Sequence, residues 1–188
     1  MKELSLNVLD IAQNSIKAEA TLVEIALKEK DGWLSLTVTD DGYGMEEELL
    51  LRVTDPFSTT RTTRKVGMGI PLLKLAAEQT GGTLSIRSTP KSKEEVAHGT
   101  TVTATFDMGH VDFTPIGDIV STVVLLIQGS PNIDFRFTHE RANGTVCLDT
   151  REMRMILGEE VPLDDFAVLE WTREMLTEQY ASEEPIQE

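Results

Sequence analysis

Three polar side chains near the N-terminus have the spacing and the chemistry of a reactive site. Asp10, Asn14 and Lys17 stand at i, i+4 and i+7, which places them on one stripe of a helix. A carboxylate can take a proton from a nucleophile, an amide oxygen is a ligand suited to Mg²⁺, and an ammonium group can hold a phosphate. A polar stripe is also the normal solvent-facing side of a surface helix, so these residues alone leave both interpretations open.

Two glycine-containing segments later in the chain suit a nucleotide. Residues 40–45 read Asp-Asp-Gly-Tyr-Gly-Met. Gly42 and Gly44 would let the backbone approach a flat ligand closely. A carboxylate of this segment could accept a hydrogen bond from an exocyclic amine such as that of adenine. Residues 66–70 read Val-Gly-Met-Gly-Ile at the start of a predicted helix, whose free N–H groups suit an anion such as a triphosphate. Asp-Asp-Gly is also a common turn, and one Gly-x-Gly is weak evidence by itself.

The periodicity of apolar residues predicts the elements that carry these segments. Helices are expected at 2–18, 46–52, 69–79, 116–127, 150–157 and 163–180, and strands at 21–27, 33–39, 83–88, 100–106, 133–137 and 145–148. Asp31-Gly32 and Asn143-Gly144 are hairpin signals. The order of elements predicts an α+β protein: an α/β sandwich with helices on one face of a mixed sheet over residues 1–107, then a small acidic α+β domain over 108–188.

Composition and charge narrow the class of protein. The chain has 188 residues, of which 40% are hydrophobic and 26% charged, as in soluble globular proteins. Its net charge of −15 argues against a nucleic-acid partner, and the excess is uneven: residues 1–106 hold 12 basic and 15 acidic residues, and residues 107–188 hold 5 and 17. Cys147 is the one cysteine, and no stretch reaches the roughly 18 apolar residues of a membrane span. We therefore expect a cytoplasmic protein without a membrane partner.

The order of the motifs resembles that of a known superfamily. Residues 10–18 (Asp-Ile-Ala-Gln-Asn-Ser-Ile-Lys-Ala), 40–44, 55–60 (Asp-Pro-Phe-Ser-Thr-Thr), 67–70 and 99–101 (Gly-Thr-Thr) resemble the N box, first glycine box, F box, second glycine box and terminal Gly-Thr of GHKL proteins. These are the ATP-binding domains of DNA gyrase, Hsp90-type chaperones, histidine kinases and MutL mismatch-repair ATPases, and they imply a Bergerat-type sandwich. Residues 56–88 most resemble the histidine-kinase branch, whereas residues 13–21 also resemble mismatch-repair ATPases.

The resemblance implies a role for each matched residue. Asn14 would ligate Mg²⁺, Asp40 would accept from the adenine amine, and Thr100 would support that contact through a hydroxyl or a water. Asp10 would be the catalytic base, and Lys17 would contact phosphate in both binding and catalysis. The other positions implied to bind ATP are Gly42, Gly44, Met45, Arg61, Arg64, Lys65, Gly67, Met68, Gly69 and Ile70. Loop cations such as those at 61–65 are also commonly just solvated.

Three observations bear on what happens to bound ATP. ATP-hydrolysing relatives usually have Glu where this chain has Asp10, and many kinases have Asn or Glu there. The shorter side chain of Asp draws the carboxylate back by about 1.5 Å. Nine residues precede Asp10, so we expect a phosphate acceptor to lie on a separate protein. In gyrase-like and mismatch-repair ATPases, a lysine from the second domain contacts the γ-phosphate. Residues 107–188 contain no Lys, so this part of the chain lacks the residue for that mechanism.

The sequence therefore predicts an Mg-ATP-binding regulatory protein, an ATPase or protein kinase that acts on a separate partner. Two alternatives stay open: a nucleotide-gated protein-binding module without turnover, and a solo anti-sigma-type serine kinase. We expect the acidic extension to dock a basic protein surface, with binding that weakens as the salt concentration rises.

Overall fold

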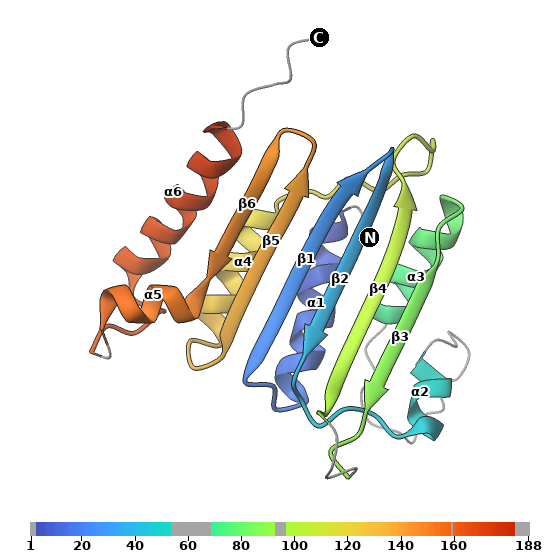
Figure 1. Ribbon diagram of the computed structural model, residues 1–188, viewed down its shortest axis with the longest axis horizontal. Coiled ribbons are helices and arrows are strands. Elements are labelled where there is room, and N and C mark those ends of the chain that lie inside the picture. Colours follow the sequence, from blue (N-terminus) through green and yellow to red (C-terminus); the bar gives the residue numbers. More distant parts are fainter. Residues whose placement is uncertain (1–2, 54–68, 93–96, 159, 183–188) are drawn as a thin grey trace.

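A six-stranded mixed sheet forms the centre of the protein, with strand order β3-β4-β2-β1-β5-β6 (Figure 1). The computed structural model describes residues 3–53, 69–92, 97–158 and 160–182. The strands are β1 (Leu22–Lys30), β2 (Trp33–Asp40), β3 (Leu84–Thr89), β4 (Gly99–Asp107), β5 (Asp134–Arg141) and β6 (Gly144–Asp149). Neighbouring strands run antiparallel except β1 and β5, which are parallel.

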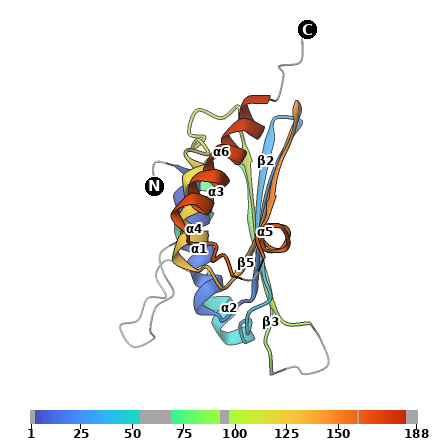
Figure 2. The same cartoon turned by 90° about the vertical axis from the view of Figure 1, so that its left-hand side faces the viewer.

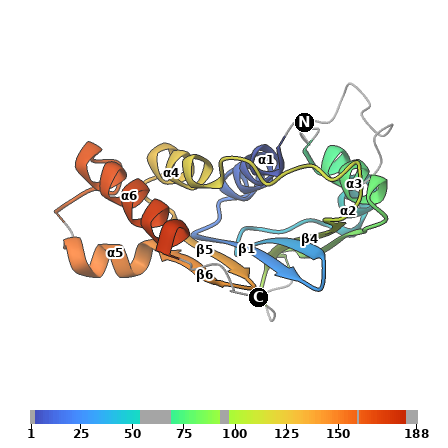
Figure 3. The same cartoon turned by 90° about the horizontal axis from the view of Figure 1, so that it is seen from above.

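A layer of four helices covers one face of this sheet. The helices of the described residues, within this layer and outside it, are α1 (Leu4–Lys17), α2 (Glu47–Val53), α3 (Gly69–Gln79), α4 (Ile119–Gly129), α5 (Thr150–Leu157) and α6 (Phe166–Ser182). Helices α3, α1, α4 and α6 form the layer in that order, whereas α5 lies on the other side of the sheet beside β5 (Figures 2 and 3). The prediction of an α+β fold with helices on one face of a mixed sheet is confirmed. None of the helices within the described ranges is long and apolar enough to cross a membrane.

The core lies between the sheet and the helix layer, because alternate strand residues face the helices. On β1, Val23, Ile25 and Leu27 are each at most 1% exposed, and their neighbours along the strand are less buried. The opposite face of the sheet carries hydroxyl groups, such as the cross-strand pair Thr37 and Thr103, whose Oγ1 atoms are 3.3 Å apart. This division explains why the strands read as alternating apolar and polar residues.

The C-terminal strands extend the same sheet. Strand β5 pairs with β1 from Leu22–Asp134 to Lys28–Glu140, and β6 pairs with β5. Lys28 and Glu140 also form an ion pair of 2.6 Å across this junction. Helix α4 packs on α1 in the same way as α3 does. Residues on both sides of the predicted boundary at 107/108 thus share one sheet and one helix layer, and their division into two domains stays a prediction.

Local turn chemistry accounts for the small differences between predicted and observed ends. Strand β1 continues to Lys30 because Asp31 and Gly32, with φ of 53° and 80°, make a tight hairpin turn to β2. Helix α4 begins only at Ile119, since the Asp118 carboxylate accepts from the Ser121 N–H at 2.9 Å and caps the helix there.

A buried polar cluster attaches α6 to the sheet. The His139 ring, 3% exposed, lies 3.0 Å from the Glu29 carboxylate through Nε2 and 2.8 Å from the Tyr180 hydroxyl through Nδ1. A neutral ring satisfies both contacts, with Nε2–H donating to Glu29 and the tyrosine O–H donating to Nδ1. The Arg141 guanidinium lies 4.7 Å from the centre of the Tyr180 ring. One histidine therefore joins β1, β5 and α6.

This cluster predicts that stability falls in mild acid. Burial lowers the pKa of His139 against the opposing effect of Glu29, so below pH of about 6.5 the unfolded chain binds a proton that the folded chain resists. The stabilising contribution is complete above that pH and is lost as the pH falls. We expect the free energy of unfolding, from denaturant titrations between pH 7.5 and 5, to fall more steeply in wild type than in His139→Gln, by up to about 1.4 kcal/mol per pH unit.

The matched control is His110→Gln, because the His110 side chain is 38% exposed outside this cluster. In this variant, the free energy of unfolding should fall with decreasing pH as steeply as in wild type. Equal slopes for wild type and His139→Gln would contradict the prediction.

Candidate functional site

Helix α1 places the N-terminal polar stripe on its accessible side, away from the sheet. Its apolar side, including Val8 and Ile11, is buried against the sheet. Asp10 and Lys17 are exposed and Asn14 is half-buried. The spacing therefore brings the three predicted residues to one accessible stripe, as the sequence indicated.

The Asp40 carboxylate at the end of β2 receives hydrogen bonds from three separate segments. Its Oδ2 accepts from the Ser15 hydroxyl of α1 at 2.7 Å, and its Oδ1 accepts from the N–H groups of Gly42 at 3.0 Å and Thr100 at 3.2 Å. These contacts bring together three of the predicted site residues, Asp40, Gly42 and Thr100. They also hold the carboxylate in one orientation beside the end of α1 that carries Asn14.

Ser15 is a site residue that sequence reasoning missed. The sequence pattern places it on the apolar side of α1, and its side chain is 3% exposed. A buried hydroxyl needs a hydrogen-bond partner. That requirement, together with its position directly after Asn14, was the signal that could have identified it.

The segment after β2 passes close to α1 and β3, and glycine makes this approach possible. A Cβ on Gly42 would lie 2.6 Å from the Ala18 carbonyl oxygen, and one on Gly44 would lie 2.0 Å from that of Thr89. Gly44 also has φ of +67°, in the left-handed region. The Tyr43 N–H donates to the Ala18 carbonyl at 2.9 Å, so the segment is fastened to the end of α1.

Ser88 connects Met45 to Thr100. The Ser88 Oγ accepts from the Met45 N–H at 2.8 Å, donates to the Gly99 carbonyl at 3.1 Å and lies 2.9 Å from the Thr100 Oγ1. Because the one hydroxyl proton of Ser88 points to Gly99, the Thr100 hydroxyl donates to Ser88 and keeps its own lone pairs available as acceptors. Thr100 thus contacts Asp40 through its backbone N–H, and its hydroxyl contacts Ser88.

The neighbouring carboxylate, Asp41, is engaged differently. Its Oδ1 accepts from the N–H groups of Thr21 at 2.7 Å and Leu22 at 2.9 Å, and its Oδ2 accepts from the Thr21 hydroxyl at 2.5 Å. Partial burial by itself would raise the pKa of Asp41, but these hydrogen bonds outweigh it and hold the pKa below the ordinary value. Asp41 therefore fixes the start of β1, and Asp40 is the carboxylate beside α1.

His98 belongs to the structure of this segment. Its ring is half-buried, and its Nδ1 lies 2.6 Å from the Gly42 carbonyl oxygen. Since a carbonyl can only accept, Nδ1 carries the hydrogen. His98, just before β4, thus holds the Gly42 end of the glycine segment.

The start of α3 lies against Asp10. A Cβ on Gly69 would be 2.9 Å from the Asp10 Cβ and 3.3 Å from its Oδ2, so only glycine permits the two helices to approach so closely. The Asp10 carboxylate consequently stands near the N-terminal end of α3, where a negative charge is favourable. Ile70, the next residue, is 5% exposed and packs into the core.

Five predicted residues lie outside the described ranges: Arg61, Arg64, Lys65, Gly67 and Met68. Lys17 is exposed on α1, and its carbonyl accepts from the Tyr43 hydroxyl at 3.3 Å. Within the described parts of the chain, no group of three or more His, Cys, Asp or Glu side chains is placed to hold a metal ion.

Comparison with known proteins identifies the family. The model of the histidine kinase-, DNA gyrase B- and HSP90-like ATPases matches residues 2–110. The chain belongs to this family, which confirms the GHKL resemblance inferred from its motifs.

Sensor histidine kinases are among the relatives in sequence. An NtrY-like sensor histidine kinase of Rickettsia conorii is 28% identical over 113 residues, which cover 60% of this chain and 18% of that protein. The sensor histidine kinase ZraS of Klebsiella oxytoca is 31% identical over 91 residues, which cover 48% of this chain and 19% of that protein. The chain thus spans less than a fifth of the length of these relatives.

Solved structures share the fold at low sequence identity. The MutL ATPase domain of Aquifex aeolicus, solved in complex with ADP, has a TM-score of 0.55 at 13% identity and covers 99% of this chain and 100% of its own. The N-terminal domain of a DNA repair protein has a TM-score of 0.54 at 18% identity, covering 79% of this chain and 53% of its own. Residues beyond 110 therefore also have a counterpart in the MutL fold.

The contacts of Gly44 give a test of the glycine segment. We expect Gly44→Ala to lower the free energy of unfolding by roughly 2 kcal/mol more than Gly81→Ala, because its Cβ would meet the Thr89 carbonyl. Gly81 is the matched control, since it has φ of +74° and nothing lies within 4 Å of its added Cβ. Denaturant titrations of both variants measure the difference, and similar losses would contradict the close approach.

Proposed function

We propose that this protein is an Mg-ATP-binding regulatory protein that acts as an ATPase or a protein kinase on a separate partner. The nucleotide site comprises the outer stripe of α1, the glycine segment at residues 40–45 and the start of α3. The family supports the proposal, as does the ADP complex of the MutL domain that shares the fold.

The single observation that carries the proposal is the arrangement around Asp40. Three donors from α1, the glycine segment and β4 hold its carboxylate. A carboxylate has about four acceptor sites, so it retains capacity for one more donor. The exocyclic amine of adenine is such a donor, whereas the corresponding position of guanine is a carbonyl. The site therefore favours adenine.

Asn14 suits a magnesium ion that arrives with the nucleotide. Mg²⁺ is commonly bound through one or two protein oxygens together with substrate phosphates and waters. Asn14 provides one amide oxygen, half-buried on α1 next to the Asp40 contact. The ion would neutralise phosphate charge, and Lys17, one turn further along the helix, would add a cation on the same stripe.

The start of α3 provides the place for the phosphates. Gly69 stands at the N-terminal end of the helix, where free N–H groups bind anions. The resemblance assigns the remaining contacts to residues preceding this helix, which are Arg61, Arg64, Lys65, Gly67 and Met68.

Asp40→Asn tests the adenine contact. The amide would present an N–H₂ group to donors that now meet a carboxylate, so we expect Mg·ATP to bind about 10- to 100-fold more weakly by isothermal titration calorimetry. Asp41→Asn is the matched control: it removes the same charge one residue away, from a carboxylate whose described partners are Thr21 and Leu22. It should keep ATP affinity and lose stability. Equal affinity of Asp40→Asn and wild type would contradict the assignment.

A second function, nucleotide-gated protein binding without turnover, is favoured by one observation. Asp10 packs against Gly69 at the N-terminal end of α3, where a carboxylate stabilises the helix whether or not it accepts a proton. The side chain of Asp10 is also shorter than the Glu of ATP-hydrolysing relatives, which likewise favours binding without hydrolysis.

Release of labelled phosphate from γ-labelled ATP separates the two functions. For an ATPase we expect phosphate release that Asp10→Ala lowers by about 100-fold or more, since a positioned base contributes that much. Gln13→Ala, at an exposed position of the same helix, is the control and should keep the wild-type rate. Mg·ATP binding without phosphate release or transfer to a partner would support the module without turnover.

The partner in this proposal is a basic protein that docks on residues 108–188. Helix α6 presents Glu170, Glu174 and Glu178 at exposed positions spaced four residues apart. Like charges gathered on one surface attract an oppositely charged protein and set its orientation.

A further inference from the structure

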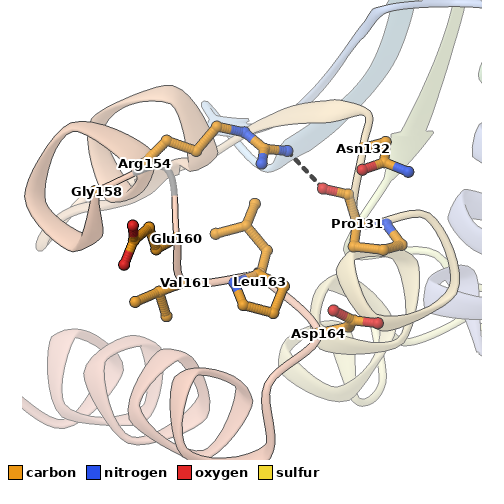
Figure 4. Close-up of a pocket in the computed structure, with 9 residues that line it drawn as sticks. Pro131, Asn132, Arg154, Gly158, Glu160, Val161, Leu163 and Asp164 are labelled. Atoms are coloured by element: carbon orange, nitrogen blue, oxygen red, sulfur yellow. Dashed lines mark hydrogen bonds between the residues drawn. The ribbon is translucent and has the colours of Figure 1, made fainter.

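A cavity of about 620 Å³ lies in the C-terminal part of the molecule, away from the candidate nucleotide site. Arg154 of α5, Gly158, residues 160–164 and the turn before β5 line it (Figure 4). Leu163 is fully buried, and Val161 and Pro131 add apolar surface. The volume falls in the range of cavities that bind small groups or side chains.

The cation in this cavity is already paired. The Arg154 Nε donates to the Asp134 carboxylate at 2.9 Å, and its Nη2 donates to the Pro131 carbonyl at 2.5 Å. The Thr150 hydroxyl donates to the same Asp134 oxygen at 3.0 Å. These bonds fix the guanidinium to the wall and neutralise its charge locally.

Two further carboxylates line the cavity, at Glu160 and Asp164. Both residues are exposed, and neither forms an ion pair with another described residue. With Arg154 matched by Asp134, the lining carries an excess of negative charge. A cavity whose wall combines apolar side chains with two carboxylates suits an alkyl chain that ends in a cation. The chain would contact Val161 and Pro131, and its head would meet the carboxylates.

Apolar side chains beside the cavity indicate a protein ligand. Met155 and Ile156 in the last turn of α5 are 81% and 74% exposed, and Phe166 at the start of α6 is 78% exposed. These residues are close in the chain to the cavity-lining residues Arg154, Gly158 and Asp164, and exposed apolar side chains next to a binding site can contact a protein ligand. A second copy of this chain would bring its own acidic extension to the surface, where like charges repel, so charge complementarity favours a basic partner.

We propose that this cavity binds an arginine or lysine side chain from a basic amphipathic segment of a partner protein, and that the apolar side chains of α5 and α6 contact the apolar side of that segment. The proposal rests on the partner named under the proposed function and specifies its docking site. It does not depend on ATP binding, so the two can fail separately.

The test uses the full chain, labelled with ¹⁵N, and a ten-residue acetylated, amidated peptide of leucine, alanine and three arginines. We expect the peptide to shift the backbone resonances of Gly158, Val161 and Leu163 in ¹H–¹⁵N spectra. The same peptide with citrulline in place of arginine has nearly the same shape without the charge. The citrulline peptide should bind about tenfold more weakly than the arginine peptide.

Two double variants distinguish the cavity from general attraction. Glu160→Gln with Asp164→Asn should weaken binding of the arginine peptide about five- to tenfold. Glu47→Gln with Glu48→Gln removes the same charge from exposed positions of α2, outside residues 108–188, and should change the affinity less than about twofold. The folded-state spectrum and Mg·ATP calorimetry of each variant show whether the chain is intact. Failure of wild type to bind ATP would count against the proposed nucleotide site alone.

Three outcomes would overturn the docking proposal. The first is an equal loss of affinity in both double variants, and the second is peptide-induced shifts confined to residues away from the cavity. The third is a shift of the cavity resonances with protein concentration in the absence of peptide, which would assign the surface to a second copy of the chain.

Discussion

The hydrogen bond between Ser15 and Asp40 is the contact on which the candidate site depends. It joins the end of α1 to the end of β2, two elements separated by 25 positions in the chain. Asn14 and Lys17 belong to the same end of α1, so their distance from the glycine segment follows from this contact. The Asp40 carboxylate also accepts hydrogen bonds from the backbone N–H groups of Gly42 and Thr100, and the second of these attaches the start of β4 to the same site. A polar side chain buried on an otherwise apolar helix side thus sets the geometry of the site.

Strand β1 connects the candidate site to the acidic C-terminal part of the molecule. Thr21, just before β1, donates to Asp41 through its N–H and hydroxyl, and its carbonyl accepts from the Asp134 N–H at 2.9 Å. Asp134 in turn holds Arg154 at the cavity. A continuous series of hydrogen bonds therefore runs from the glycine segment to the wall of the C-terminal cavity. The parallel pairing of β1 with β5 makes this possible, because both strands begin at the same edge of the sheet.

Much of the fold could be predicted because its signals are local. Apolar periodicity located every described helix and strand, and Asp31-Gly32 marked a hairpin whose residues have the required positive φ. Helix ends were less accurate, since capping by Asp118 depends on one side chain. The contacts of the candidate site were only partly accessible from the sequence. Motif order identified Asp40, Gly42 and Thr100, but Ser15, Ser88 and His98 were missed because their roles require contacts between segments distant in sequence.

The sequence by itself determined the family, the elements and the stripe of Asp10, Asn14 and Lys17, because motif order, periodicity and helical spacing are properties of short segments. Only the tertiary structure decided that residues 134–149 extend the first sheet, because several strand orders satisfy the same alternation of apolar and polar residues. It also decided that Gly69 packs on Asp10 and that Thr100 reaches Asp40 through its backbone. Such contacts arise when separate elements pack within a few ångströms, and no local pattern encodes that distance.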